Sequence, residues 1–170
     1  MRLSTLCYVK RDGRTLMLHR VKKANDVNSG KWVGLGGRME PGETPEDCVV
    51  REVFEESGLV IRNPRLRGFL TFPAFEGNDC EYTFVFTATV SDGKLKQCDE
   101  GDLEWVDDDR IRSLALWEGD RVFLKWLDDP RLFSAKFTYS GGKFTGYSAA
   151  FYDTARGLVS TTSGSPGTGE

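Results

Sequence analysis

The segment that most constrains the fold lies between residues 44 and 58, where the sequence predicts a well-bounded helix. Thr44 suits the N-cap, Pro45 suits the first helical position, and Asp47 stands where the acid of a capping box would stand. Gly58 supplies the C-terminal stop. One face of this helix is apolar and is expected to pack against a core; it consists of Val49, Val50, Val53 and Phe54.

The opposite face carries three glutamates that a purely structural helix has little reason to hold together. At about 100° per residue, Glu52, Glu55 and Glu56 fall on one side. Like charges three and four residues apart oppose helix formation by about 0.2–0.5 kcal/mol per pair. A divalent cation such as Mg²⁺ or Mn²⁺ would turn this repulsion into coordination, because these ions prefer carboxylate oxygen. The face therefore predicts a metal site, and the alternative is a solvated acidic surface.

The loop before the helix, residues 34–43, favours the metal site over the solvated surface. It contains four glycines and one proline, a composition that permits close approach of the backbone to a ligand. Arg51 lies just outside the acidic arc, and Glu43 ends the loop. We expect a bidentate ion pair between them that fixes the loop against the helix.

Together the loop and the helix fill the pattern G-x5-E-x7-R-E-U-x-E-E-x-G-U, in which U is a bulky aliphatic residue. The filled positions are Gly37, Glu43, Arg51, Glu52, Val53, Glu55, Glu56, Gly58 and Leu59. In this complete signature the chain resembles the Nudix hydrolase superfamily. The resemblance implies an α/β fold, an α/β/α sandwich with a mixed β-sheet. It also implies hydrolysis of a nucleoside diphosphate linked to another moiety, with Mg²⁺ or Mn²⁺.

The resemblance assigns roles to single residues of the motif. Glu52 and Glu56 would be the principal metal ligands, and Glu55 would be a further one. The backbone carbonyl of Gly37 would complete the site. The ion pair between loop and helix would be structural.

Segments outside the signature resemble the MutT-type hydrolases, which release pyrophosphate from oxidised purine nucleoside triphosphates such as 8-oxo-dGTP and leave the monophosphate. The similar segments are Lys22-Lys23 and residues 30–34, 98–101, 116–120 and 133–137. Glu100 falls where this group places an additional metal-linked glutamate. The base that activates water is left open among Glu52, Glu55, Glu56 and Glu100. Other Nudix substrates (a dinucleoside polyphosphate, ADP-ribose or an RNA 5′ end) and a non-catalytic nucleotide-binding module are the alternatives.

Trp117 and Asp120 are the candidates for binding the base. Guanine presents N1–H and N2–H₂ as donors that a carboxylate accepts, and its face can stack on an indole. The alternatives are a core tryptophan and an aspartate that caps the helix beginning nearby. Lys23 and Arg38 are candidate phosphate ligands, against the alternative of ordinary surface residues.

Two departures from animal members of the MutT group concern the base. Gly119 stands where those enzymes carry a second aspartate, and Val33 stands where they carry an asparagine. Each departure removes a polar contact to the base. Asn25 or Asn28 could supply the missing amide.

Length and charge agree with one enzyme domain, expected over residues 1–159, and a flexible Ser/Thr/Gly-rich tail over residues 160–170. A net charge of −3 gives no electrostatic footprint for duplex nucleic acid, so we expect a small nucleotide as partner of a monomer or homodimer. The four cysteines lack CxxC spacing, which predicts reduced thiols in a cytoplasmic protein. We expect no signal peptide, and the sequence has no run of about 18 apolar residues that could span a membrane.

Period-two patterns dominate outside the motif and predict a sheet. Asp12-Gly13 and Ser140-Gly141-Gly142 are hairpin turns in this interpretation. A second helix is expected over residues 118–127. The expected strands cover residues 3–9, 15–19, 67–72, 81–90, 103–106, 133–139 and 143–151.

Overall fold

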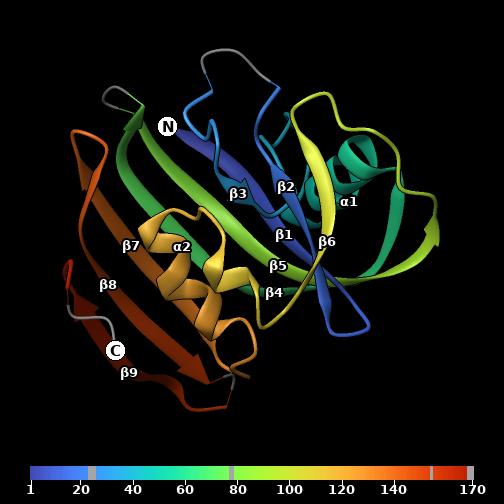
Figure 1. The fold of residues 1–170 in the computed structure, drawn as a ribbon. Coiled ribbons are helices and arrows are strands. Elements are labelled where there is room, and N and C mark those ends of the chain that lie inside the picture. The colour runs from blue at the N-terminus through green and yellow to red at the C-terminus, as the bar shows by residue number, and fades with distance from the viewer. Residues whose placement is uncertain (23–25, 77–78, 154, 168–170) are drawn as a thin grey trace.

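The computed structural model describes residues 1–22, 26–76, 79–153 and 155–167. A nine-stranded sheet forms its centre, in the order β3-β2-β1-β5-β4-β7-β8-β9, with β6 pairing with β2 off this path (Figure 1). The strands are β1 (Arg2–Arg11), β2 (Arg14–His19), β3 (Trp32–Val33), β4 (Leu59–Glu76), β5 (Asp79–Gly93), β6 (Asp102–Asp107), β7 (Leu132–Ser140), β8 (Lys143–Asp153) and β9 (Gly157–Gly164).

The sheet is mixed, as expected. β1 runs parallel to β5 and β4 runs parallel to β7, while the other neighbouring pairs are antiparallel. Both predicted hairpin turns are confirmed, because Asp12-Gly13 joins β1 to β2 and Gly141-Gly142 joins β7 to β8. β4 and β5 are considerably longer than the patterns that predicted them.

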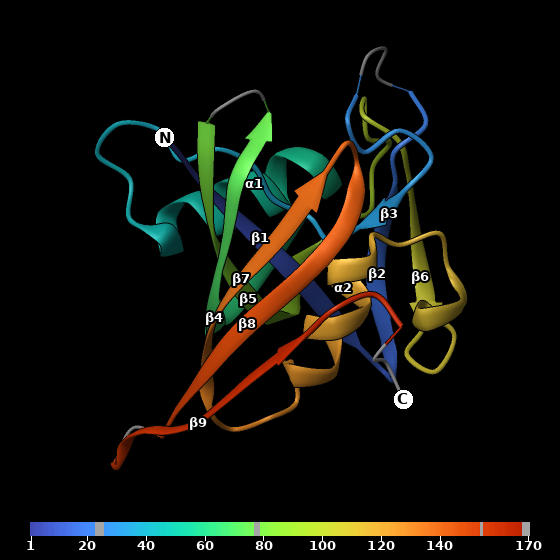
Figure 2. The ribbon, with the colours of Figure 1, turned by 90° about the vertical axis from the view of Figure 1, so that its left-hand side faces the viewer.

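Two helices cover opposite faces of the sheet (Figures 1 and 2). They are α1 (Pro45–Ser57) and α2 (Glu118–Phe123). Alternation along β1 separates their two cores: Tyr8 packs in the cluster that includes Phe123 of α2, whereas Cys7 and Val9 pack in the cluster that includes Val53 of α1. The α/β/α sandwich is therefore confirmed.

The buried face of α1 differs from the predicted apolar arc. Val49 and Val53 are fully buried, but Val50 is 39% exposed and Phe54 is 51% exposed. The buried stripe is shifted toward the acidic face, so that Glu56 is buried and lines the cavity. The prediction was wrong for Val50 and Phe54, because periodicity alone does not fix which stripe of a helix meets the sheet. The buried residues of α1 are Cys48, Val49, Val53, Glu56 and Ser57.

Two boundaries also differ. The second helix ends at Phe123 and continues as a 3-10 turn, η2 (Leu124–Trp126), after an earlier turn η1 (Ile111–Ser113). Residues 160–164, predicted to begin a flexible tail, belong to β9, which pairs antiparallel with β8 along the edge of the sheet (Figure 2). β8 offers an open edge, and the hydroxyl-rich segment has strand-forming threonines that can use it.

Within the described residues, no helix has the length and apolar character needed to cross a membrane. All four cysteines are free, and Cys7, Cys48 and Cys98 are buried.

Candidate active site

A cavity of about 1080 Å³ opens where β1 begins, between the loop before α1 and the first residues of α2. This volume is slightly above the range of about 300–1,000 Å³ that is common for small-ligand pockets, so it can hold a nucleotide. Among the predicted site residues, the cavity gathers Gly37, Arg38, Glu52, Glu55, Glu56, Glu100, Trp117 and Asp120. Lys23 lies outside the described residues.

The termini of α1 hold the acidic face in place. The Thr44 hydroxyl accepts the Asp47 N–H at 3.1 Å, and the Asp47 carboxylate accepts the Thr44 N–H at 3.0 Å. The Gly58 N–H donates to the Phe54 carbonyl at 2.8 Å. The predicted capping box and C-terminal stop are confirmed, so the backbone that carries the glutamates is fixed by local sequence.

Arg51 ties the loop to the helix. Its Nε and Nη2 donate to the two carboxylate oxygens of Glu43 at 2.6 and 2.9 Å, which confirms the bidentate pair. Nη2 also donates to the Arg38 carbonyl at 3.1 Å, and Nη1 reaches Glu52 at 2.7 Å and Glu55 at 3.2 Å. Hydrogen bonding to Arg51 lowers the pKa of Glu43 to about 2.

Glu56 carries the most strongly perturbed carboxyl of the motif. Its side chain is buried and accepts the Gly36 N–H at 2.8 Å. Burial, together with the nearby charges of Glu100 and Glu52, raises the pKa of Glu56 to about 8 despite this hydrogen bond. Burial also raises the pKa of Glu52, against the lowering effect of Arg51.

Gly37 permits the close approach of the loop to α1. A Cβ at this position would lie 2.5 Å from the carboxylate carbon of Glu52, so no other residue fits without displacing that side chain. The Gly37 carbonyl accepts the Thr5 N–H at 2.9 Å and a weak Cys48 thiol contact at 3.8 Å. The Gly37 carbonyl oxygen therefore already contacts both β1, through Thr5, and α1, through Cys48.

Arg20 was missed by the sequence analysis. It follows β2, and its largely buried side chain donates to Asp26 at 2.6 Å and to Glu100. This pair holds Glu100 at the cavity, near enough to Glu56 of α1 for its charge to raise the pKa of that carboxyl. The available signal was weak, since it consisted of one arginine at the end of a predicted strand.

The donor set fits a divalent cation of the Mg²⁺ or Mn²⁺ kind. Every candidate ligand is an oxygen, and the raised pKa values of Glu52 and Glu56 report negative charge crowded into a buried place. Across the described ranges, no three acidic, histidine or cysteine side chains are grouped as a metal site. Two of the glutamates form ion pairs with arginines instead, since Arg51 contacts Glu52 and Arg20 contacts Glu100. Ligation would exchange these arginine contacts for the cation.

Trp117 forms a wall of the other end of the cavity. Its Nε1 donates to the Asn28 carbonyl oxygen at 2.8 Å, and its ring meets Tyr139 edge-on at 5.8 Å between centroids. The Lys31 ammonium lies 4.9 Å from the ring centroid. The indole is half-buried and lines the cavity, which argues against a tryptophan that serves only the core.

Asp120 does not cap α2. The N-cap is Trp117, with no side-chain cap hydrogen bond. Asp120 is 8% exposed and lines the cavity, and its carboxylate accepts no hydrogen bond among the residues the structure describes. Burial raises its pKa to about 7, against the lowering effects of Lys31 and Arg121. A buried carboxylate without a donor is costly, so its position fits a ligand that brings donors.

Tyr139 is a second residue that the sequence analysis missed. It lines the cavity from the end of β7, and its hydroxyl accepts the Gly119 N–H at 3.0 Å. The signal was present in strand alternation, because Phe133 and Phe137 point into the core and Tyr139 is the next residue on that face.

Comparison with known proteins agrees with this geometry. The NUDIX domain family matches residues 1–127. The Nudix hydrolase YvcI of Bacillus subtilis is 32% identical over 80% of this chain and 85% of its own length. An oxidized purine nucleoside triphosphate hydrolase of Danio rerio is 29% identical over 82% of this chain and 88% of its own. Matches also include an ADP-ribose pyrophosphatase and NAD-capped RNA hydrolases, so similarity alone does not decide the substrate.

The crystal structure of a MutT protein from Bacillus halodurans superimposes with a TM-score of 0.76 at 31% identity, covering 86% of this chain and 96% of that one. The fold is thus shared with a solved MutT protein, and the stretch that the family model matches includes the motif and its helix. The chain belongs to the Nudix hydrolases and is of the MutT type.

Proposed function

We propose that this Nudix hydrolase converts purine nucleoside triphosphates, with oxidised purines such as 8-oxo-dGTP as the favoured class, to the monophosphate and pyrophosphate. The observation that carries the proposal is that one cavity is lined both by carboxylates and by residues suited to bind a base. A cluster of carboxylates faces the place for phosphates, and Trp117 with the unpartnered Asp120 faces the place for a base.

At the carboxylate end, Glu52, Glu55, Glu56 and Glu100 with the Gly37 carbonyl would hold Mg²⁺ or Mn²⁺. When bound, the cation neutralises phosphate charge and lowers the pKa of coordinated water. A glutamate of this set accepts the proton of the water that attacks the phosphorus nearest the sugar. The Arg51–Glu43 pair keeps the loop in register, and Arg38 at the cavity wall is the candidate phosphate contact.

At the base end, Asp120 accepts the N1–H and N2–H₂ groups of a guanine-type edge. Its raised pKa, about 7, makes a donor-rich partner favourable, since a bound donor replaces lost hydration. Trp117 provides the flat apolar surface for the ring, and it is held in that position by Asn28.

A substrate panel with Mg²⁺ tests the proposal. It contains 8-oxo-dGTP, dGTP, dATP, dCTP, ADP-ribose, a dinucleoside polyphosphate and a capped RNA, with separate detection of pyrophosphate and phosphate. We expect the highest kcat/KM for 8-oxo-dGTP, with pyrophosphate released and no phosphate. Faster turnover of ADP-ribose, a dinucleoside polyphosphate or capped RNA would replace the proposal with another Nudix activity. Nucleotide binding without turnover would make the chain a binding module.

A further inference from the structure

We infer that the hydroxyl of Tyr139 and the amide group of Asn28 are specificity-determining hydrogen-bond donors that read a carbonyl group on the purine. The cavity would then select keto purines, the guanine class, over amino purines, the adenine class. The inference rests on the proposed function, because it takes the base to lie between Trp117 and Asp120.

The first donor follows from how Tyr139 is held. Its oxygen accepts the Gly119 N–H at 3.0 Å, so its own hydrogen must point elsewhere. Within the described residues the hydroxyl donates no hydrogen bond, and the side chain lines the cavity together with Asp120. Burial raises the pKa of Tyr139, so the hydroxyl stays protonated and remains a donor at neutral pH.

Gly119 explains why the hydroxyl can occupy this place. A Cβ at position 119 would lie 2.7 Å from the Tyr139 oxygen and 2.9 Å from Cδ1 of Phe137. Any side chain there would push the tyrosine out of position. Gly119 lacks the polar contact of the second aspartate, but its missing side chain also leaves room for the Tyr139 hydroxyl, a polar group from β7.

The second donor follows from the chemistry of the indole. Trp117 Nε1 can only donate, so the side-chain atom of Asn28 that lies 2.8 Å away must be the carbonyl oxygen. The amide NH₂ is then left on the other branch of the same planar group, and it donates no hydrogen bond within the described residues. Asn28 lines the cavity, and its own N–H is fixed by the Asp26 carboxylate at 2.9 Å.

The three polar groups complement one class of base. Asp120 is an acceptor, and Asn28 and Tyr139 are donors. Guanine and 8-oxoguanine present donors at N1 and N2 and an acceptor at O6, whereas adenine presents a donor at N6. Adenine would place a donor against donors, and a site built to hydrogen-bond one group rejects an analogue that lacks it.

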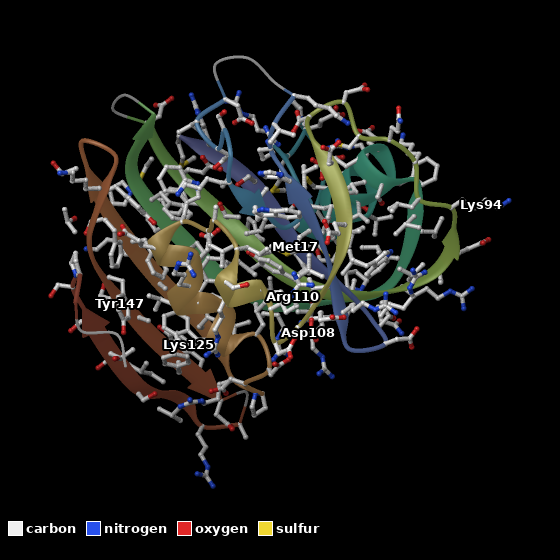
Figure 3. The ribbon with its side chains drawn as sticks, in the orientation of Figure 1. Met17, Lys94, Asp108, Arg110, Lys125 and Tyr147 are labelled. Atoms are coloured by element: carbon white, nitrogen blue, oxygen red, sulfur yellow. The ribbon has the colours of Figure 1, made fainter. Side chains whose placement is uncertain are left out.

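The first test is Tyr139→Phe, which removes the donor and keeps the ring against Trp117. We expect kcat/KM for dGTP and 8-oxo-dGTP to fall about five- to twentyfold, with less than about a twofold change for dATP. Tyr147→Phe is the matched control. Tyr147 lies on β8 and stacks on Phe137 at 5.7 Å, away from the cavity lining, so its hydroxyl should not affect base choice (Figure 3).

The second test is Asn28→Asp, which keeps an oxygen for Trp117 Nε1 but replaces the NH₂ donors with an acceptor. We expect the dGTP/dATP ratio of kcat/KM to fall at least tenfold, while the melting temperature shows that the variant is folded. Equal losses on both nucleotides in both variants would mean a structural role and would overturn the inference. A wild-type chain that hydrolyses dGTP and dATP equally well would overturn it and leave the proposed activity standing. A wild-type chain that hydrolyses no triphosphate would overturn both.

Discussion

The two ends of the cavity are built in different ways. The carboxylate end comes almost entirely from one continuous segment, residues 37–59, whose loop and helix are locked together by their own caps and by Arg51. The base end is assembled from a loop, the start of α2 and the end of β7, through Asn28, Trp117, Asp120 and Tyr139. Most residues of the metal site thus come from one local segment, whereas the residues proposed to bind the base come from elements far apart in the chain.

Electrostatics separates the same two ends. At the carboxylate end, arginines compensate the acids, since Arg51 pairs with Glu43 and Glu52, and Arg20 pairs with Glu100. At the base end, Asp120 is buried and accepts no side-chain hydrogen bond within the described residues, although the charges of Lys31 and Arg121 act on it. At the carboxylate end, a metal cation can take the place of the arginine contacts of the glutamates. At the base end, Asp120 can accept hydrogen bonds from the neutral N–H groups of a base.

The comparison of the carboxylate end with the base end predicts that substitution of Glu56 has the largest effect on catalysis. Glu56→Gln removes one charge with almost no change in shape, and we expect a loss of about 3–4 kcal/mol in transition-state stabilisation for every nucleotide alike. Initial rates on 8-oxo-dGTP and dCTP at saturating Mg²⁺ measure it. Near-native turnover of the variant would show that this face is not the site of chemistry.

Asp120→Ala should give the next largest effect, restricted to the base end. We expect a loss of about 2–3 kcal/mol in kcat/KM for 8-oxo-dGTP and dGTP, because a charge-assisted contact disappears. The loss for dCTP should be much smaller. If the three substrates lost activity equally, Asp120 would support the fold or the carboxylate end, and the division into two ends would fail.

Arg51→Ala separates structure from chemistry within the carboxylate end. It leaves Glu43 without its bidentate partner and frees the loop, so we expect the melting temperature to fall by roughly 3–6 °C together with activity. Glu52→Gln is the comparison variant and should lose activity with little change in melting temperature. The reverse pattern in the two melting curves would exchange their roles.

The smallest effect is a pH dependence of stability in metal-free protein. An unfolded glutamate titrates near pH 4.3, while burial raises the pKa of folded Glu56 to about 8. The folded state therefore holds this proton at higher pH, and its stabilising contribution is complete below about pH 4 and is lost as the pH rises through about 8. We expect the melting temperature with chelator to fall by roughly 2–5 °C more in wild type than in Glu56→Gln between pH 5 and 8. If the melting temperatures of wild type and Glu56→Gln changed equally with pH, the raised pKa of Glu56 would be contradicted.

Some of the fold could be predicted because its causes are local. Capping residues define α1, a Gly-containing turn and strand alternation define the β1–β2 and β7–β8 hairpins, and opposite charges at loop and helix define the Arg51–Glu43 pair. Each of these depends on residues close enough in sequence for propensity and spacing to decide the outcome.

Other features depended on packing. Which stripe of α1 is buried, the pairing of residues 160–164 with β8, and the contact of Arg20 with Glu100 all require a partner element that local periodicity does not specify. The sequence by itself determined the motif, its capped helix and the kind of ion that the acids suit. Only the tertiary structure decided that Tyr139 and Asn28 meet Asp120 in one cavity, because long-range sheet pairing sets the distances between strands.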